Sequence, residues 1–201
     1  MREFWDEAYA ENDYIFGTEP NLFLTRCVDL LESGKHALAL ADGEGRNGVW
    51  LAQRGLKVHS IDFSANALQK ARQLARLQGV AITFEEADLL TWNWPTEHYD
   101  LVAAIFIQFA PPAQREQIFR HIKAALKPGG LLLMEGYTPK QLDYKTGGPS
   151  NPDNLYTETL LRDAFGDWEI LELREYEAFL TEGTKHYGQS ALIDLAARKP
   201  R

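Results

Sequence analysis

The chain has 201 residues, of which 45% are hydrophobic, and a formal net charge of -8 at pH 7. This length is enough for one well-packed domain and too short for a nucleotide-binding domain followed by a separate dehydrogenase substrate domain. The negative charge, with no cluster of Lys and Arg, argues against nucleic acid as a partner, because binding phosphate backbones needs concentrated positive charge. We therefore expect a single domain over residues 1–201 that acts on a small molecule.

The sequence gives no indication of a membrane or secretory segment. Its longest apolar stretch, 101–110, is far shorter than the roughly 20 residues of a membrane-spanning helix, and the N-terminus lacks a basic, then apolar, leader pattern. Cys27 is the only cysteine, which excludes an intrachain disulfide or a multi-cysteine metal site. We expect a cytoplasmic protein, monomeric or homodimeric, without a membrane partner.

Apolar runs and helical patterns alternate along most of the chain. An amphipathic pattern after Pro20 predicts a helix that stops at Ser33-Gly34. Strands are then predicted at 36–41, 57–62, 81–86, 98–106 and 131–136, with helices at 46–54, 64–79 and 111–126. This alternation is typical of a mostly parallel sheet with right-handed crossovers.

The pattern changes after Gly136. Residues 137–156 are rich in Gly, Pro, Asn and Thr and show neither helical nor strand periodicity, and so long a loop is usually functional. A short helix is expected at 157–165, followed by two strand-like runs that begin at Trp168 and Ser190 and form a hairpin. We divide the domain into an N-terminal cap and helix (1–34), a core (35–136), the loop (137–156) and the C-terminal helix and hairpin (157–201).

The segment 37–48 combines an apolar run with Gly43, Gly45 and Gly48 and leads into a helical pattern. Glycines at a turn from strand to helix let the backbone approach a bulky ligand. The next apolar run ends at Asp62, at about the 20-residue distance of the ribose-binding acid in dinucleotide folds. The two features together indicate a cofactor that carries adenosine.

Glycine spacing leaves two cofactor classes open. The run Gly43-Glu-Gly45-Arg-Asn-Gly48 fits the GxGxxG fingerprint of NAD or FAD folds. In another register, Ala39-Leu-Ala41-Asp-Gly43-Glu-Gly45 is an altered copy of the (D/E)xGxGxG loop of methyltransferases. Asp88 after a third apolar run and Lys127-Pro-Gly-Gly before a fifth favour the second class.

With these residues the chain resembles the class I methyltransferases that depend on S-adenosylmethionine (SAM), and within them the tellurite-resistance (TehB-like) and thiopurine-methyltransferase-like branch. The resemblance extends over nearly the whole chain. It includes 14–21, Gly45-Arg46-Asn47, Tyr137-Thr-Pro139 and Thr146-Gly147-Gly148-Pro149. It implies a single-domain, Rossmann-like α/β three-layer sandwich, with a mostly parallel seven-stranded sheet and an antiparallel strand in the C-terminal hairpin.

The same resemblance implies SAM as cofactor, bound at the carboxyl ends of the first, second and fourth strands and covered by the N-terminal segment. Asp62 would accept hydrogen bonds from the ribose, and Asp88 from the adenine amino group beside the Leu89 N–H. Phe63 would pack on the adenine face, although an ordinary core position explains it equally well. The expected cofactor-binding residues are Ala41, Gly43, Gly45, Arg46, Asp62, Phe63, Ser64, Asp88, Leu89, Ile105 and Phe106.

The glycine loop departs from the family at two positions, because Ala39 stands at the usual acidic position and Ala41 replaces the first glycine. An alanine keeps the turn if its φ is negative. Asp42, or carbonyls after the fourth strand, would then hold the methionine end, while Glu44 is expected to be a solvated loop acid. Arg46 could cap its helix, pair with an acid or meet an anionic substrate. These departures leave open a SAM-binding protein without methyltransferase activity, and less favourably a small NAD-dependent oxidoreductase.

Methyl transfer from a sulfonium is an in-line displacement that needs positioning and exclusion of water more than it needs a base. The resemblance implies a small acceptor such as a thiol, tellurite or selenite. Tyr14, Gln108 and His186 are the candidate catalytic residues, and each is also explained by packing or, for His186, by an exposed histidine. Phe16, Phe106, Tyr137 and Tyr156 are expected on the substrate side. No metal site is expected, and Cys27 is expected to be a buried small hydrophobe.

Overall fold

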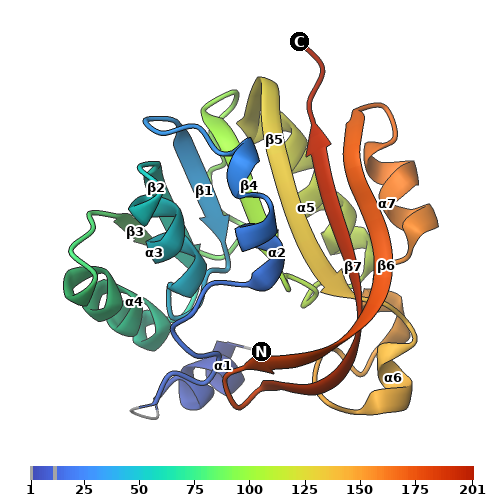
Figure 1. The fold of residues 1–201 in the computed structure, drawn as a ribbon, viewed down its shortest axis with the longest axis horizontal. Helices are drawn as coiled ribbons and strands as arrows, with labels where there is room; N and C mark the ends of the chain where they lie inside the picture. The colour runs from blue at the N-terminus through green and yellow to red at the C-terminus, as the bar shows by residue number, and fades with distance from the viewer. Residues whose placement is uncertain (1, 11–12) are drawn as a thin grey trace.

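A computed structural model of the chain describes residues 2–10 and 13–201, with side chains from Trp5 onward within those ranges. In this part of the chain, seven strands form one sheet in the order β3-β2-β1-β4-β5-β7-β6 (Figure 1). The strands are β1 (His36–Leu40), β2 (Lys57–Asp62), β3 (Thr83–Glu86), β4 (Tyr99–Ile105), β5 (Leu126–Tyr137), β6 (Glu169–Glu182) and β7 (His186–Arg198).

Strands β1 to β5 pair in parallel, whereas β7 is antiparallel to both of its neighbours, β5 and β6. The chain order reverses beside β1, since β2 and β3 lie on one side of it and β4 and β5 on the other. In open α/β sheets a ligand cleft forms at such a point, outside the carboxyl ends of the strands. The predicted fold, a mostly parallel seven-stranded sheet with an antiparallel hairpin strand, is confirmed.

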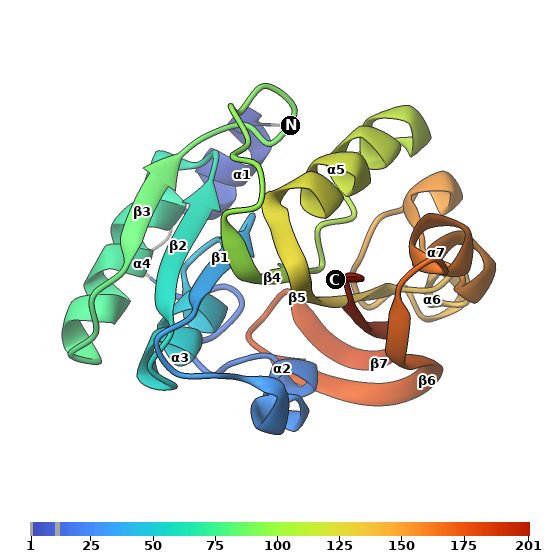
Figure 2. The same ribbon diagram turned by 90° about the horizontal axis from the view of Figure 1, so that it is seen from above.

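Helices cover both faces of the sheet. Figure 2 shows α2 and α3 on one face and α5 and α7 on the other, which gives the three layers expected for the fold. The helices are α1 (Arg2–Ala8), α2 (Leu22–Arg26), α3 (Arg46–Gln53), α4 (Ala65–Leu77), α5 (Pro112–Ala125), α6 (Gln141–Tyr144) and α7 (Glu158–Phe165), with short 3-10 turns η1 (Val28–Leu30) and η2 (Pro152–Asn154). Each of these described helices is too short or too polar to span a membrane.

The central strand β1 shows how the two layers are built. Leu38 and Leu40 point into the apolar cluster that contains residues of α5 and α7, and Ala37 and Ala39 point into the cluster on the side of α2 and α3. A strand buried on both faces reads as a continuous apolar run, which is why 37–41 has no polar alternation. Ala39, at the position where the family has an acid, is 1% exposed and belongs to this core.

Two expectations about local structure are wrong. The helix predicted from Pro20 to Ser33 is only α2 followed by η1. The loop 137–156 is not structureless, because it contains α6 and η2. Gln141 holds this loop through bonds that no local pattern reveals: its Nε2 donates to Gly147 O at 3.1 Å, and its Oε1 accepts from Ala191 N on β7 at 2.9 Å.

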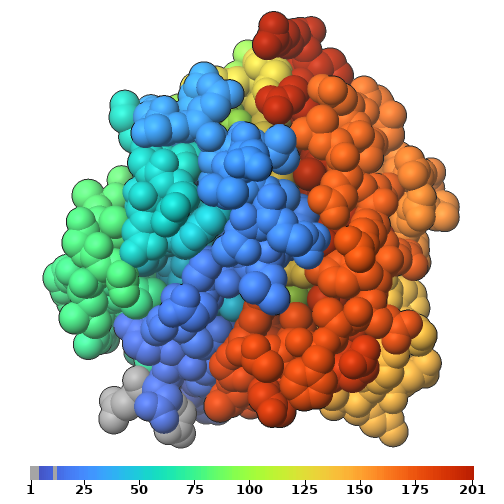
Figure 3. All heavy atoms as spheres, viewed as in Figure 1, coloured from blue at the N-terminus to red at the C-terminus, as the bar shows by residue number. Residues whose placement is uncertain are grey.

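The N-terminal segment lies against the turn of the β6–β7 hairpin, and Figure 3 shows the two side by side on one face. The carbonyl of Ile15 accepts from Thr184 N at 2.8 Å and from Lys185 N at 3.1 Å. Gly183 has φ +70, and a Cβ there would lie 2.4 Å from the Ile15 oxygen. Only glycine allows this close approach, which places the N-terminal segment and the hairpin turn beside the switch point of the sheet.

Candidate functional site

A cavity of about 510 Å³ lies at the carboxyl ends of β1, β2 and β4. The N-terminal segment, the loop after β5 and the hairpin turn close its sides. It is lined by Trp5, Tyr9, Phe16, Ala41, Asp42, Gly43, Glu44, Arg46, Asn47, Asp62, Phe63, Ile105, Phe106, Gln108, Phe109, Tyr137, Gly147, Gly148, Pro149, Ser150, Asn151, Asn154, Lys185 and His186. Its size is within the range of small-molecule binding sites, which is roughly 300–1,000 Å³.

The glycine turn after β1 forms the cavity floor with strained backbone. Ala41 has φ +45, so the negative φ under which an alanine would keep the turn without strain is not present, and the alanine occupies a left-handed conformation that glycine adopts more easily. A Cβ on Gly43 would lie 2.9 Å from Tyr9 Oη. Gly45 has a different role, since a Cβ there would lie 2.6 Å from the Ala71 Cβ of α4. Gly45 thus allows α4 to pack on the turn and does not itself line the cavity.

Asp62 ends β2 with a carboxylate that is held rigidly beside the turn. It accepts from Gly43 N and from Ser64 N, each at 2.9 Å, and the residue is 3% exposed. Burial raises the pKa of Asp62 to about 6. Ser64 serves the fold here, because it caps α4 by accepting from Ala67 N at 3.2 Å and does not line the cavity.

The two acids of the turn, Asp42 and Glu44, are buried. Asp42 accepts from Ser60 Oγ at 2.8 Å, and burial raises its pKa to about 7. Glu44 pairs with Lys70 at 2.8 Å and accepts from Phe16 N at 3.3 Å, with 2% of the residue exposed. The expectation of a solvated Glu44 is therefore wrong, because α4 and the N-terminal segment both cover this side chain.

Aromatic rings gather around His186 at the other end of the cavity. Ring centroids lie 4.4 Å from His186 for Phe106, 4.5 Å for Phe16 and 5.8 Å for Tyr137. The His186 side chain is 11% exposed, so the alternative of a lone exposed histidine is wrong. Burial lowers the pKa of His186, which favours the neutral imidazole.

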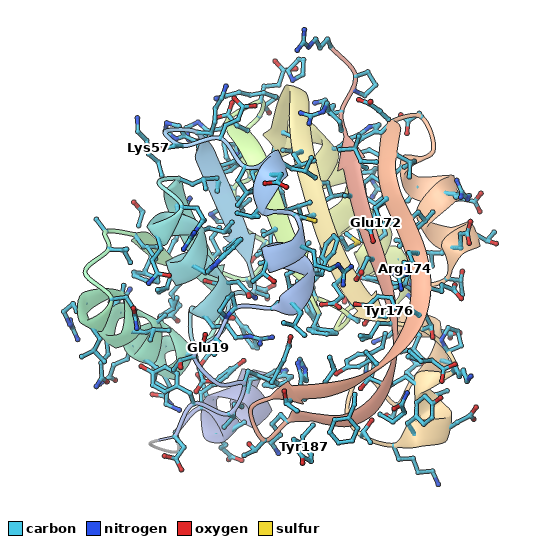
Figure 4. All side chains as sticks on the ribbon, viewed as in Figure 1. Glu19, Lys57, Glu172, Arg174, Tyr176 and Tyr187 are labelled. Carbon is cyan, nitrogen blue, oxygen red and sulfur yellow. The ribbon has the colours of Figure 1, made fainter. Side chains whose placement is uncertain are left out.

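Beneath this aromatic end, Arg46 forms a buried ion pair with Glu182. Arg46 Nη2 lies 2.7 Å from Glu182 Oε2, and the two side chains are 6% and 7% exposed. Arg46 Nη1 also donates to Glu19 O at 3.4 Å, in the segment that leads into α2 (Figure 4). Asn47 Oδ1 accepts from Asn21 N at 2.9 Å. The start of α3 is thus bound to both the N-terminal segment and the hairpin.

The other two candidate catalytic residues have structural partners. Gln108 lines the cavity, but its Nε2 donates to Tyr137 O at 2.9 Å and its Oε1 accepts from Tyr137 N at 2.6 Å. Its side chain therefore joins the end of β4 to the end of β5. Tyr14 lies outside the lining residues, and its hydroxyl donates to Lys70 O at 3.1 Å.

Phe63 lies between this cavity and a second one of about 720 Å³, which Asp88 also lines. Asp88 Oδ1 accepts from Leu90 N at 2.9 Å, and Leu89 is buried. Of the expected cofactor-binding residues, the first cavity is lined by Ala41, Gly43, Arg46, Asp62, Phe63, Ile105 and Phe106. Gly45, Ser64 and Leu89 line neither cavity.

Several lining residues were not expected from the sequence. Phe109 follows β4 closely and could have been found from its neighbours Phe106 and Gln108. Asn154 and Lys185 carried no signal, because they reach the cavity only through the fold of the loop and the hairpin. Glu182, which touches the site through Arg46, could have been noticed as an acid beside the glycines of a predicted hairpin.

Known proteins resemble the chain in sequence and in fold. Residues 37–130 match a family model described as "Methyltransferase domain". The chain is 29% identical over 199 residues to a thiopurine S-methyltransferase of Pseudomonas fluorescens, which covers 86% of this chain and 87% of that protein. It is 33% identical over 118 residues to a demethylmenaquinone methyltransferase of Thermus thermophilus, with 57% of this chain covered. The match spans about half the length of that relative, 53%.

Among solved structures, TehB from Haemophilus influenzae superposes with a TM-score of 0.73 at 19% sequence identity. The match covers 98% of this chain and 66% of that one. At this identity the superposition shows a shared fold.

Proposed function

Because the chain belongs to the class I SAM-dependent methyltransferases, we propose that it transfers the methyl group of SAM to a small acceptor bound beside His186. One observation carries this proposal. A single cavity joins the glycine turn and Asp62 at one end to the aromatic rings around His186 at the other. The first end suits the adenosine half of the cofactor, and the second suits the acceptor.

The residues at the first end fit SAM. Gly43 lines the cavity without a side chain, which lets its backbone come close to a ligand and lets the Tyr9 hydroxyl pack beside it. Asp62 offers a fixed carboxylate for the ribose hydroxyls, and Phe63 offers a ring face for adenine. When bound, SAM supplies a methyl group activated by a positively charged sulfur, and the nearby rings of Phe106 and Tyr137 would attract that charge.

The residues at the second end favour a soft acceptor, and we propose a thiol. Arg46 is neutralised by Glu182, and Phe16, Phe106 and Tyr137 supply apolar walls. Within the described residues the buried Tyr137 hydroxyl has no hydrogen-bond partner, which leaves it available to a ligand. The relative named thiopurine S-methyltransferase supports a sulfur acceptor. A chalcogen oxyanion such as tellurite is the second acceptor that we propose, from the sequence resemblance to the tellurite-resistance branch.

The residues around the cavity would each have a role in this methyl transfer. The aromatic rings of Trp5, Tyr9 and Phe16 cover the cavity and exclude water from the displacement. The hairpin turn and the loop after β5 hold the acceptor in line with the methyl group. His186, neutral at pH 7, accepts a proton where the acceptor brings one.

We also propose that the chain forms a single domain over 1–201 and acts in the cytoplasm as a monomer or homodimer. Its partner would be a small molecule and not a nucleic acid. The net charge of -8 supports the last of these.

Two measurements on the same sample test the function. Calorimetric titration should show binding of SAM and S-adenosylhomocysteine and none of NAD. Mass spectrometry after incubation with SAM should then detect methylated product with benzyl mercaptan or with tellurite. SAM binding with no product from any acceptor would support the alternative of a binding protein without transferase activity, and NAD binding would contradict the cofactor assignment.

A further inference from the structure

Glu182 ends β6 with a buried carboxylate that three donors hold in place. Its Oε2 accepts from Arg46 Nη2 at 2.7 Å, and its Oε1 accepts from Asn21 Nδ2 at 3.2 Å and from Leu22 N at 3.4 Å. These donors belong to α3 and to the start of α2. The position of the carboxylate is therefore set by elements that lie outside the hairpin.

His186 is the cross-strand partner of Glu182 at the hairpin turn, and its Nδ1 lies 3.8 Å from Glu182 Oε2. Within the described residues this buried Nδ1 has no hydrogen-bond partner. Phe16 and Phe106 pack against the ring and limit its rotation. Since Nδ1 lies on the side of Glu182, Nε2 is the nitrogen left for the cavity that His186 lines.

Building on the proposed function, we propose that Glu182 is a positioning residue that orients His186 and makes it the proton acceptor for a thiol. The S–H proton moves to His186 Nε2, and the electron pair of that bond stays on the acceptor sulfur. This sulfur forms the new bond to the methyl carbon while the bond from that carbon to the cofactor sulfur breaks. The pair from the broken bond remains on S-adenosylhomocysteine, and the proton leaves His186 to water.

The charges around His186 agree with this role. Glu182 faces it from β6, Arg46 from α3 and Tyr137 from β5. Burial lowers the pKa of His186, so the ring is neutral at pH 7 and can accept a proton. Burial acts to raise the pKa of Glu182, but His186 and Arg46 together hold it below its usual range. A fixed carboxylate beside a neutral imidazole stabilises the protonated ring.

The role of Glu182 is tested with Glu182→Gln, which keeps the shape and removes the charge. Two acceptors are compared, benzyl mercaptan, protonated at pH 7, and 4-nitrothiophenol, ionised at pH 7. We expect kcat with benzyl mercaptan to fall by about 100-fold, as for loss of a general base, and kcat with 4-nitrothiophenol to change by less than about threefold. Glu177→Gln is the matched control, an exposed glutamate of the same strand paired with Lys140, and should leave both rates unchanged.

The pH dependence separates this role from a structural one. Glu182 raises the pKa of His186, so Glu182→Gln should move the acid limb of the kcat/KM profile to lower pH. NMR titration of the His186 ring should show the same shift without turnover. If Glu182→Gln fails to fold, His186→Gln should likewise lower kcat with benzyl mercaptan and leave kcat with 4-nitrothiophenol nearly unchanged.

Each other result overturns a defined part of the proposal. Equal losses with both thiols, no loss with either, or an unshifted His186 titration would each overturn the role of Glu182 while methyl transfer stands. Failure of the native protein to methylate either thiol would instead overturn the proposed acceptor class, and with it the proton transfer.

Discussion

The two ends of the cavity are built in different ways. At the cofactor end, one short segment, 41–48, and the single acid Asp62 are held by bonds to nearby backbone, such as Gly43 N to Asp62 at 2.9 Å. At the acceptor end, the N-terminal segment, the end of β4, the loop after β5 and the hairpin turn come together around His186. The cofactor end is thus fixed by the sheet, and the acceptor end by contacts between distant parts of the chain. We expect changes at the first end to affect SAM affinity and changes at the second to affect turnover.

The largest effect on the cofactor end is expected from Gly43→Val. A branched side chain at φ +57 is strained and would collide with Tyr9 Oη, so we expect SAM affinity to fall by about 100-fold or more. Isothermal titration calorimetry measures the affinity for SAM. The control is Gly79→Val, which has φ +67 but no neighbour within 4 Å and should lose stability without losing affinity. Normal binding by a folded Gly43→Val variant would place the cofactor elsewhere.

A smaller loss is expected from Asp62→Ala. Removal of the carboxylate takes away charge-assisted hydrogen bonds to the ribose, which weakens SAM binding by about 1.5–3 kcal/mol. Calorimetry on the variant and on Asp167→Ala, an exposed acid paired with Lys123, provides the comparison. Unchanged affinity in a folded Asp62→Ala sample would show that this acid does not bind the cofactor.

At the acceptor end, Phe16→Ala should slow single-turnover methyl transfer by about tenfold and change SAM affinity by less than about threefold. Phe16 packs against His186 in the segment that covers the cavity, so its loss admits water and loosens the acceptor. Rapid-quench kinetics and melting temperature are measured on one sample, with the exposed Leu22→Ala as control. A less stable sample that keeps the full single-turnover rate would mean that this segment only covers core surface.

If the N-terminal segment and the loop after β5 close over the ligands, their backbone amides should exchange hydrogen more slowly in 13–19 and 137–156 when SAM and acceptor are bound.

The smallest effect is expected from Ala41→Gly. The left-handed φ of Ala41 destabilises the folded protein by about 1–2 kcal/mol, and glycine removes this strain. Glycine also gives the unfolded chain more conformational freedom, which offsets about 0.5–1 kcal/mol of the gain. We expect the free energy of unfolding to rise by about 0.5 kcal/mol, measured by urea denaturation. Ala39→Gly, two residues earlier in the buried strand, should lower it by about 1 kcal/mol. A loss of stability in both variants would contradict a strained turn at Ala41.

The same contrast explains what could be predicted from the sequence. The strands of the core and the turn before α3 follow from local patterns, because a doubly buried strand is apolar throughout and a close backbone approach needs glycine. Burial of Glu44 could not be predicted, since it depends on Lys70 and on the N-terminal segment. The surroundings of His186 and the ion pair of Glu182 with Arg46 likewise join residues far apart in the chain. The left-handed φ of Ala41 has no signature in its residue type.

The most direct test of the two-ended cavity is a crystal structure of the protein with S-adenosylhomocysteine. We expect the ribose hydroxyls within hydrogen-bond distance of Asp62 and the cofactor sulfur between the glycine turn and the ring of His186. Adenosine bound without contact to Asp62, for example in the second cavity around His59 and Trp92, would contradict it.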